Sequence, residues 1–175
     1  DGSSVLLPQV VGTKAESILL VKGLKKDTPI HKWLSAYQTI AKSANKLKAK
    51  DLSIMCGNVY PAGKDENWLI EMVAKTIESN VYIFSATKNK TAKQPSLKNL
   101  VILTTGLSRA NLSKAKQAAK KGFAIGEGVN TAKHLGDLPA NHCTPRIIEK
   151  KVKAMKKDFP KLKIKSFNEN DLEKM

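Results

Sequence analysis

Residues 122–145 read GFAIGEGVNTAKHLGDLPANHCTP, and this stretch decides how the chain is organised. Small and apolar residues recur at helical spacing in its first part, which predicts a helix face packed closely on a neighbour. They are Gly122, Ile125, Gly126, Val129, Ala132 and Leu135. Gly136 and Pro139 predict that this helix stops and that residues 138–141 are extended. Thr144 and Pro145 then predict a second helix, because threonine caps free amides and proline suits the first helical position.

The sequence on either side predicts strands that alternate with helices, which is typical of an α/β domain. Apolar runs predict strands at residues 4–7, 18–21, 52–56, 81–84 and 100–103, and LKIKSF predicts another at 162–167. The run at 18–21 is continuous enough for a strand buried on both faces, and the run at 100–103 predicts a further buried strand. Helical periodicity predicts one helix from Ile30, a second around residues 68–77 and a long third helix from about Asn111.

The order of these signals resembles the segment that joins the two domains of the leucyl aminopeptidases, which are two-metal exopeptidases of the cytosol aminopeptidase family. The residues that match the family pattern are Gly126, Val129, Asn130, Leu135, Pro139, Asn141, Thr144 and Pro145. The resemblance implies a three-layer, macro-domain-like mixed sheet flanked by helices over residues 1–109, without its first strand and helix. It implies a connector helix over 110–138 and the start of a truncated catalytic domain over 139–175.

The same resemblance implies a function for the parent protein. That protein would be a cytoplasmic hexamer that removes N-terminal residues from peptides, preferring leucine, with two divalent ions (manganese, zinc or magnesium). The present portion would pack on its own catalytic domain, support assembly and limit access to the active sites. Leu135, Pro139, Asn141, Thr144 and Pro145 would set the direction in which the chain enters the catalytic domain.

Catalytic and metal-binding residues are not expected in this portion. The metal-binding and catalytic motifs of the family have no counterpart in the sequence, so the chain alone should not hydrolyse peptides. The acidic residues show no ligand spacing, and those of the second helix, Glu71 and Glu78, are expected on a solvent-exposed face. Asn168 with Asp171 resembles a helix cap. His134, His142 and Cys143 flank the connector but match no common metal-ligand spacing. Cys56 and Cys143 are expected to be reduced thiols.

The composition keeps two other classes of function open. The net charge of +16 comes almost wholly from lysine, and a lysine-rich surface favours non-specific attraction to polyanions over base readout. One alternative is therefore a DNA-binding module of the same family, with contacts from Lys88, Lys90, Lys93 and Lys98. The other is a macro-type ADP-ribose binder that uses the strand-end loops 56–58 and 104–106. No apolar run approaches the ~18 residues of a membrane span, so no membrane partner is expected.

Overall fold

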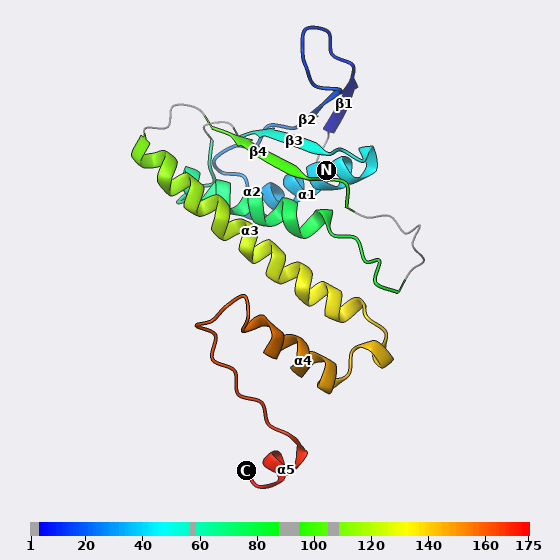
Figure 1. Ribbon diagram of the computed structural model, residues 1–175. Coiled ribbons are helices and arrows are strands. Elements are labelled where there is room, and N and C mark those ends of the chain that lie inside the picture. The colour runs from blue at the N-terminus through cyan, green and yellow to red at the C-terminus, as the bar shows by residue number, and fades with distance from the viewer. Residues whose placement is uncertain (1–3, 57–58, 88–94, 105–108) are drawn as a thin grey trace. The chain divides into compact units, whose positions relative to one another are not determined.

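The structure is a computed structural model that describes residues 4–56, 59–87, 95–104 and 109–175. The chain forms two compact units, Asp1–Ala132 and Lys133–Met175. The first unit holds strands and helices in alternation, and the second holds short helices (Figure 1). The elements are β1 Ser4–Pro8, β2 Ser17–Val21, α1 Ile30–Leu47, β3 Asp51–Met55, α2 Glu66–Val81, β4 Asn99–Leu103, α3 Arg109–Asp137, η1 Ala140–His142, α4 Pro145–Met155 and α5 Glu169–Glu173. The mixed α/β class predicted from the sequence is confirmed.

The core of the first unit is built around α2. Leu69, Val73 and Ile77 are spaced by four residues on one face of α2 and are almost completely removed from solvent. Burial of such a side chain stabilises the fold by about 1.5–3 kcal/mol. The facing side of α1 contributes Trp33 and Tyr37 to the same cluster. Asp65 caps α2, because its side chain accepts a 2.8 Å hydrogen bond from the Trp68 amide, which fixes where the helix begins.

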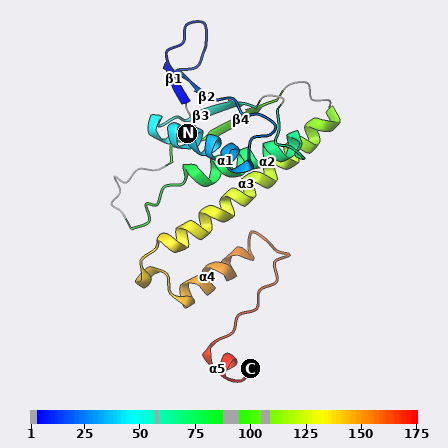
Figure 2. The ribbon, with the colours of Figure 1, turned by 180° about the vertical axis from the view of Figure 1, so that it is seen from behind.

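Strands β3 and β4 form a parallel pair that lies over α1 and α2 (Figures 1 and 2). Leu52 is paired with Leu100 and Ile54 with Ile102, and all four side chains turn toward the helices. The alternate residues point away, and Met55 is 76% exposed. The run at 100–103 was predicted to be a buried strand. It is a strand, but only Leu100 and Ile102 pack on the core, while Val101 and Leu103 are 48% and 44% exposed.

Strands β1 and β2 form an antiparallel hairpin with Leu6 opposite Leu19. The prediction that residues 18–21 are buried on both faces is wrong, since Leu20 is 53% exposed and its neighbours are half-buried. Contact with α1 covers part of β2. The observed sheets are therefore two separate two-stranded pairs, and the three-layer, macro-like arrangement stays a prediction.

Two predicted strands are absent from the described residues. Helix α2 continues through Val81, which is buried, and residues 82–84 follow without strand pairing. The apolar run 81–84 therefore includes the end of the helix as well as a connection. Residues 162–167 are also not a strand. The unit Lys133–Met175 contains no strand, and a lone strand has no ladder to join.

Candidate functional site

The 122–145 stretch packs closely on α2 through a contact between α2 and α3, here called the α2–α3 seam. It is formed by Glu71, Ala74, Lys75 and Glu78 of α2 and by Gly122, Gly126 and Asn130 of α3. A Cβ atom on Gly122 would collide with the backbone carbonyl of Glu71, and one on Gly126 would lie 2.6 Å from Glu78 Cβ. Glycine at both positions lets the two helix backbones approach, as the spacing of small residues predicts.

The N-terminal part of α3 packs on the same helix through alanines. Ala115 and Ala118 are buried against Ile70 of α2. One step along, Lys121 of α3 forms a 3.0 Å ion pair with Glu71. The lysine side chain is two-thirds exposed, so this pair contributes about 0–1 kcal/mol and serves mainly to set the register of the helices.

A polar contact closes the other end of the seam. Asn130 Nδ2 donates to the backbone oxygen of Glu78 and to its Oε1, each at 3.0 Å. Burial raises the pKa of Glu78, and the charge of Glu127 on α3 raises it further, while the hydrogen bond from Asn130 acts in the opposite direction. Glu71 and Glu78 therefore do not lie on a solvent face, and that expectation is wrong. Both line the seam because they are separated by seven residues, about two helical turns.

The five connector residues lie in the second unit. Leu135 is half-buried within α3, Pro139 precedes η1, and Asn141 is exposed within η1. Pro139 is extended, with φ −57° and ψ 152°. The predicted extended run 138–141 is nevertheless wrong at 140–141, because these residues form the short 3-10 turn η1, in which the His142 amide donates to the Pro139 carbonyl at 2.8 Å.

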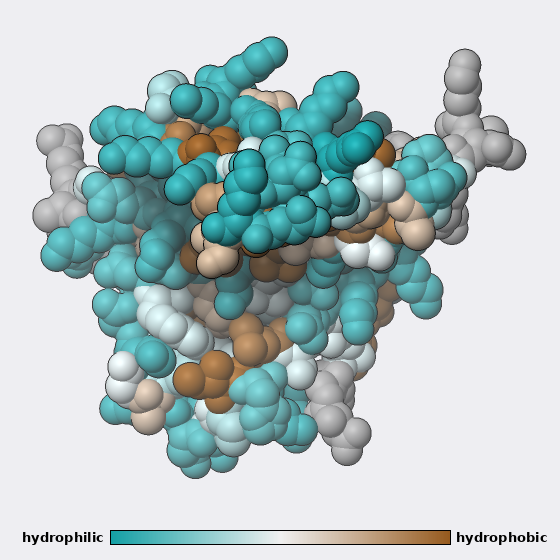
Figure 3. Space-filling model, turned by 90° about the horizontal axis from the view of Figure 1, so that it is seen from below, coloured by the Kyte–Doolittle hydropathy of each residue, from teal (hydrophilic) through white to brown (hydrophobic). Residues whose placement is uncertain are grey.

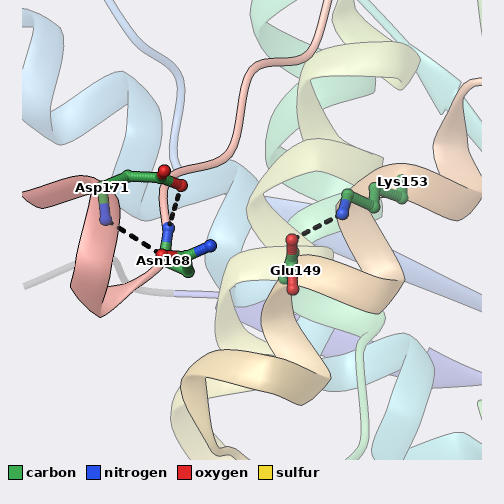
Figure 4. Close-up of polar contacts among 4 residues, drawn as sticks. All are labelled: Glu149, Lys153, Asn168 and Asp171. Atoms are coloured by element: carbon green, nitrogen blue, oxygen red, sulfur yellow. Dashed lines mark hydrogen bonds and ion pairs between the residues drawn. The ribbon is translucent and has the colours of Figure 1, made fainter.

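The predicted helix start at Thr144 and Pro145 is confirmed. Thr144 accepts a hydrogen bond from the Ile147 amide through its side chain at 3.4 Å, and Pro145 occupies the first position of α4. Inside α4, Lys153 donates to Glu149 at 2.6 Å (Figure 4). This hydrogen bond, together with one from Ser166, lowers the pKa of Glu149. The structure thus builds the start of α4 as the sequence predicts.

Helix α5 begins with a reciprocal cap. The Asp171 amide donates to Asn168 Oδ1 at 2.9 Å, and the Asn168 amide donates to Asp171 Oδ2 at 3.0 Å (Figure 4). The cap predicted from Asn168 and Asp171 is confirmed. The amide side chain of Asn168 and the carboxylate of Asp171 each accept a hydrogen bond from a backbone amide. Both side chains therefore serve to cap α5.

The apolar face of α4 is uncovered in the described part of its unit. Ile148, Val152 and Met155 follow helical spacing, and each is 36–40% exposed. Lysines 150, 151 and 153 occupy other positions around the helix. The surface seen from below is largely hydrophilic, with apolar side chains exposed between the hydrophilic ones (Figure 3). A helix with such a stripe is typical of one that packs on further protein.

Of the four lysines predicted to contact polyanions, the structure describes Lys98. Lys98 is exposed, and its amide donates to the Lys50 carbonyl at 2.7 Å where β4 begins. Lys88, Lys90 and Lys93 lie outside the described residues. Contact with DNA therefore stays a prediction.

Of the two strand-end loops, the structure describes the first residue of each, Cys56 and Thr104. The Cys56 amide donates to the Leu103 carbonyl at 3.2 Å, so the carboxyl ends of β3 and β4 are adjacent. The remainder of these loops, 57–58 and 105–106, lies outside the described residues. Cys56 is buried beside the Tyr37 hydroxyl, and burial raises the pKa of its thiol, which makes it a poor nucleophile. Cys56 and Cys143 are both free cysteines.

Within residues 4–56, 59–87, 95–104 and 109–175, no three or more His, Cys, Asp or Glu side chains gather in a way that could hold an ion. In the same ranges, no helix is both long enough and apolar enough to cross a membrane.

Sequence reasoning missed the partner of Asn130. Asn130 belongs to the motif quoted above, but Glu78 was assigned to solvent. The sequence carries one indication of this contact: Glu71, Ala74 and Glu78 recur at helical spacing on one side of α2, as the small residues do on α3. Because a glutamate on a helix surface is ordinarily solvated, the role of Glu78 becomes apparent only when α2 and α3 are seen to pack together.

Residues 1–91 match the family model described as the cytosol aminopeptidase family, N-terminal domain. A probable cytosol aminopeptidase of Aromatoleum aromaticum is 30% identical over 99% of the chain and 35% of its own length. The cytosol aminopeptidase of Pseudomonas aeruginosa is 25% identical, with the same coverage. The chain thus spans about a third of the length of the curated relatives it matches.

Solved structures show the same fold. A mutant of tomato leucine aminopeptidase superimposes with a TM-score of 0.77 at 17% identity, covering 99% of the chain and 33% of that protein. The bottromycin maturation enzyme BotP in complex with Mn gives a TM-score of 0.68 at 16% identity, over 90% of the chain and 30% of that protein.

Proposed function

The chain belongs to the cytosol aminopeptidase family, and on that premise we propose that it is a non-catalytic support for the peptidase part of its parent protein. The observation that carries the proposal is the match of residues 1–91 to the N-terminal domain of this family. The parent protein is a cytoplasmic leucyl aminopeptidase that releases N-terminal residues from peptides, and it works as a hexamer.

The support is mechanical. Residues 1–109 form the N-terminal domain, 110–138 the connector helix and 139–175 the start of the catalytic domain. The α2–α3 seam fixes the connector helix to the first unit, because backbone contact at Gly122 permits little sliding. Leu135, Pro139, Asn141, Thr144 and Pro145 set the direction of the chain beyond it. The exposed face of α4 then packs on the remainder of the catalytic domain, which favours assembly and limits access to the active sites.

The two divalent ions of the parent protein belong to its catalytic part. The described residues do not fit a metal pair, since no three donor side chains converge among them. A BotP structure contains Mn. Manganese, zinc or magnesium can each act as the Lewis acid in peptide hydrolysis. No step of the reaction is assigned to residues of this chain.

Two substitutions in the complete parent protein test the support role. Gly122→Leu places a large side chain in the seam, whereas Gly128→Leu, on the same helix, is the control because a Cβ at Gly128 meets no atom of the described residues within 4 Å. We expect Gly122→Leu to lower the yield of assembled enzyme and to leave the kcat of assembled enzyme unchanged. A large fall in the kcat of correctly assembled Gly122→Leu enzyme would contradict the proposal.

A second candidate function is polyanion binding, favoured by the net charge of +16 and the exposure of Lys98. Lys88, Lys90, Lys93 and Lys98 supply the contacts to phosphates. DNA affinity should then fall steeply with salt, and replacing all four lysines by glutamine should flatten the slope. An unchanged slope would exclude these four residues as the contact site.

A further inference from the structure

The side chains of Glu78 and Asn130 form one hydrogen bond with each other, although a carboxyl group and an amide can form two. Both N–H groups of Asn130 are used, one on the backbone oxygen of Glu78 and one on its Oε1. The amide oxygen Oδ1 of Asn130 is buried and has no hydrogen-bond partner in the described part of the chain. A buried acceptor without a donor is unfavourable, and a native structure tends to satisfy it.

A protonated carboxyl group supplies the missing donor. A carboxylic acid and a primary amide can form two parallel hydrogen bonds, in which the amide N–H donates to one carboxyl oxygen and the carboxyl O–H donates to the amide oxygen. The first of these bonds is present at 3.0 Å. A proton on the second carboxyl oxygen of Glu78 would complete the pair at Asn130 Oδ1.

We propose that Glu78 and Asn130 form a proton-operated latch between α2 and α3. The proton on Glu78 closes the second hydrogen bond and removes one negative charge from the seam. Loss of that proton opens the bond, and the carboxylates of Glu78 and Glu127 then repel each other. The latch therefore holds the Gly126–Asn130 turn of α3 more tightly in acid than at neutral pH.

The surroundings of Glu78 support this direction. From α3 it faces the carboxylate of Glu127 and the neutral Asn130, and from α1 the uncharged Asn45 contacts this end of α2 by donating to the Asn80 carbonyl. Lys75 lies on α2 itself, and its backbone oxygen faces Gly126. Burial, and then Glu127, raise the pKa of Glu78.

The sign of the pH dependence follows from that shift. A pKa that is higher in the folded than in the unfolded chain means that folding takes up a proton. The contribution of the latch to stability is therefore complete below the unfolded pKa of glutamate. It is lost as the pH rises through the raised pKa of Glu78.

Glu78→Gln is the decisive variant, because a glutamine amide can make both hydrogen bonds to Asn130 without a proton. We expect its melting temperature to exceed that of the parent chain by about 2–4 °C at pH 8, and the difference to shrink toward pH 4. The control Glu16→Gln changes an exposed glutamate outside the seam and should show no such trend. A Glu78→Gln chain that melts no higher than the parent at pH 8 would overturn the latch.

A double-mutant cycle separates the latch from an ordinary hydrogen bond to a carboxylate. Glu78→Ala, Asn130→Ala and the double variant are compared with the parent chain at pH 4.5 and pH 8. The latch predicts a larger coupling between the two positions at pH 4.5. A larger coupling at pH 8 would show that the charged carboxylate is the stronger partner, and equal couplings would show that the proton is irrelevant. Either result rejects the proposal.

Discussion

Gly122 of α3 faces the backbone carbonyl of Glu71 on α2, and the two lie so close that a Cβ atom on Gly122 has no room. The backbone of Glu71 cannot move aside as a flexible side chain can, so the close approach of the two helices requires a residue without a side chain at position 122. The same helix carries Gly128, where a Cβ would meet no atom of the described residues within 4 Å. The two glycines therefore form a matched pair for experiment.

Gly122→Ala should lower the free energy of unfolding by up to about 2 kcal/mol. Overpacking in a close contact costs about 1–3 kcal/mol because it forces the helices apart, and alanine recovers roughly 1 kcal/mol of this relative to glycine within a helix. Gly128→Ala should instead stabilise the chain by about 0.5–1 kcal/mol. Urea unfolding of both variants measures the difference. Equal effects of the two substitutions would show that the seam is not closely packed.

Leu69→Ala should lower the free energy of unfolding by about 2–5 kcal/mol, because Leu69 is 1% exposed at the centre of the α1–α2 core and leaves a cavity. Leu20→Ala, at an exposed position of β2, is the control and should change it by less than about 1 kcal/mol. Thermal or urea unfolding checks both. If the two variants lose similar stability, the core does not lie where the structure places it.

Thr144→Ala should weaken the start of α4 by about 1 kcal/mol, since the Ile147 amide loses its side-chain acceptor. Thr144→Ser keeps the hydroxyl and should behave like the parent chain. Hydrogen exchange of the amides in the first turn of α4 reports this directly. Unchanged exchange in Thr144→Ala would mean that the cap contributes nothing.

Lys153→Gln should raise the pKa of Glu149 toward its ordinary value, because the hydrogen bond from Lys153 is the largest influence that lowers it. A lowered folded-state pKa stabilises α4 above the unfolded pKa of glutamate, and this is lost as the pH falls through the folded pKa. The variant should therefore lose helix α4 at a higher pH on acidification. Carboxyl NMR titration checks the shift, with Lys150→Gln as the control, since position 150 follows 149 directly and does not face it.

The sequence predicted those elements that local chemistry determines. The start of α4 follows from Thr144 and Pro145, and the start of α5 from Asn168 and Asp171, because a cap needs only neighbouring residues. The glycine face of α3 was also predicted, since Gly122 and Gly126 are four residues apart. In these places periodicity and capping both indicate one structure.

The errors fall where a neighbour decides the outcome. Residues 81–84 are apolar and β-branched enough for a strand, yet Val81 completes the buried face of α2. Residues 162–167 alternate as a strand does but have no partner strand in the described chain. Glu78 is of a residue type that usually faces solvent, and it becomes part of the seam only because α3 packs on α2. Tertiary contacts of this kind are not encoded in any single window of sequence.

The most direct test of the central claim is to measure hydrolysis of leucyl-p-nitroanilide by purified residues 1–175 with manganese, zinc or magnesium, beside the complete parent protein. The account predicts that the parent protein releases p-nitroaniline and that residues 1–175 release none above the metal-only blank. Metal-dependent turnover by residues 1–175, abolished by a chelator and restored by the ion, would contradict it.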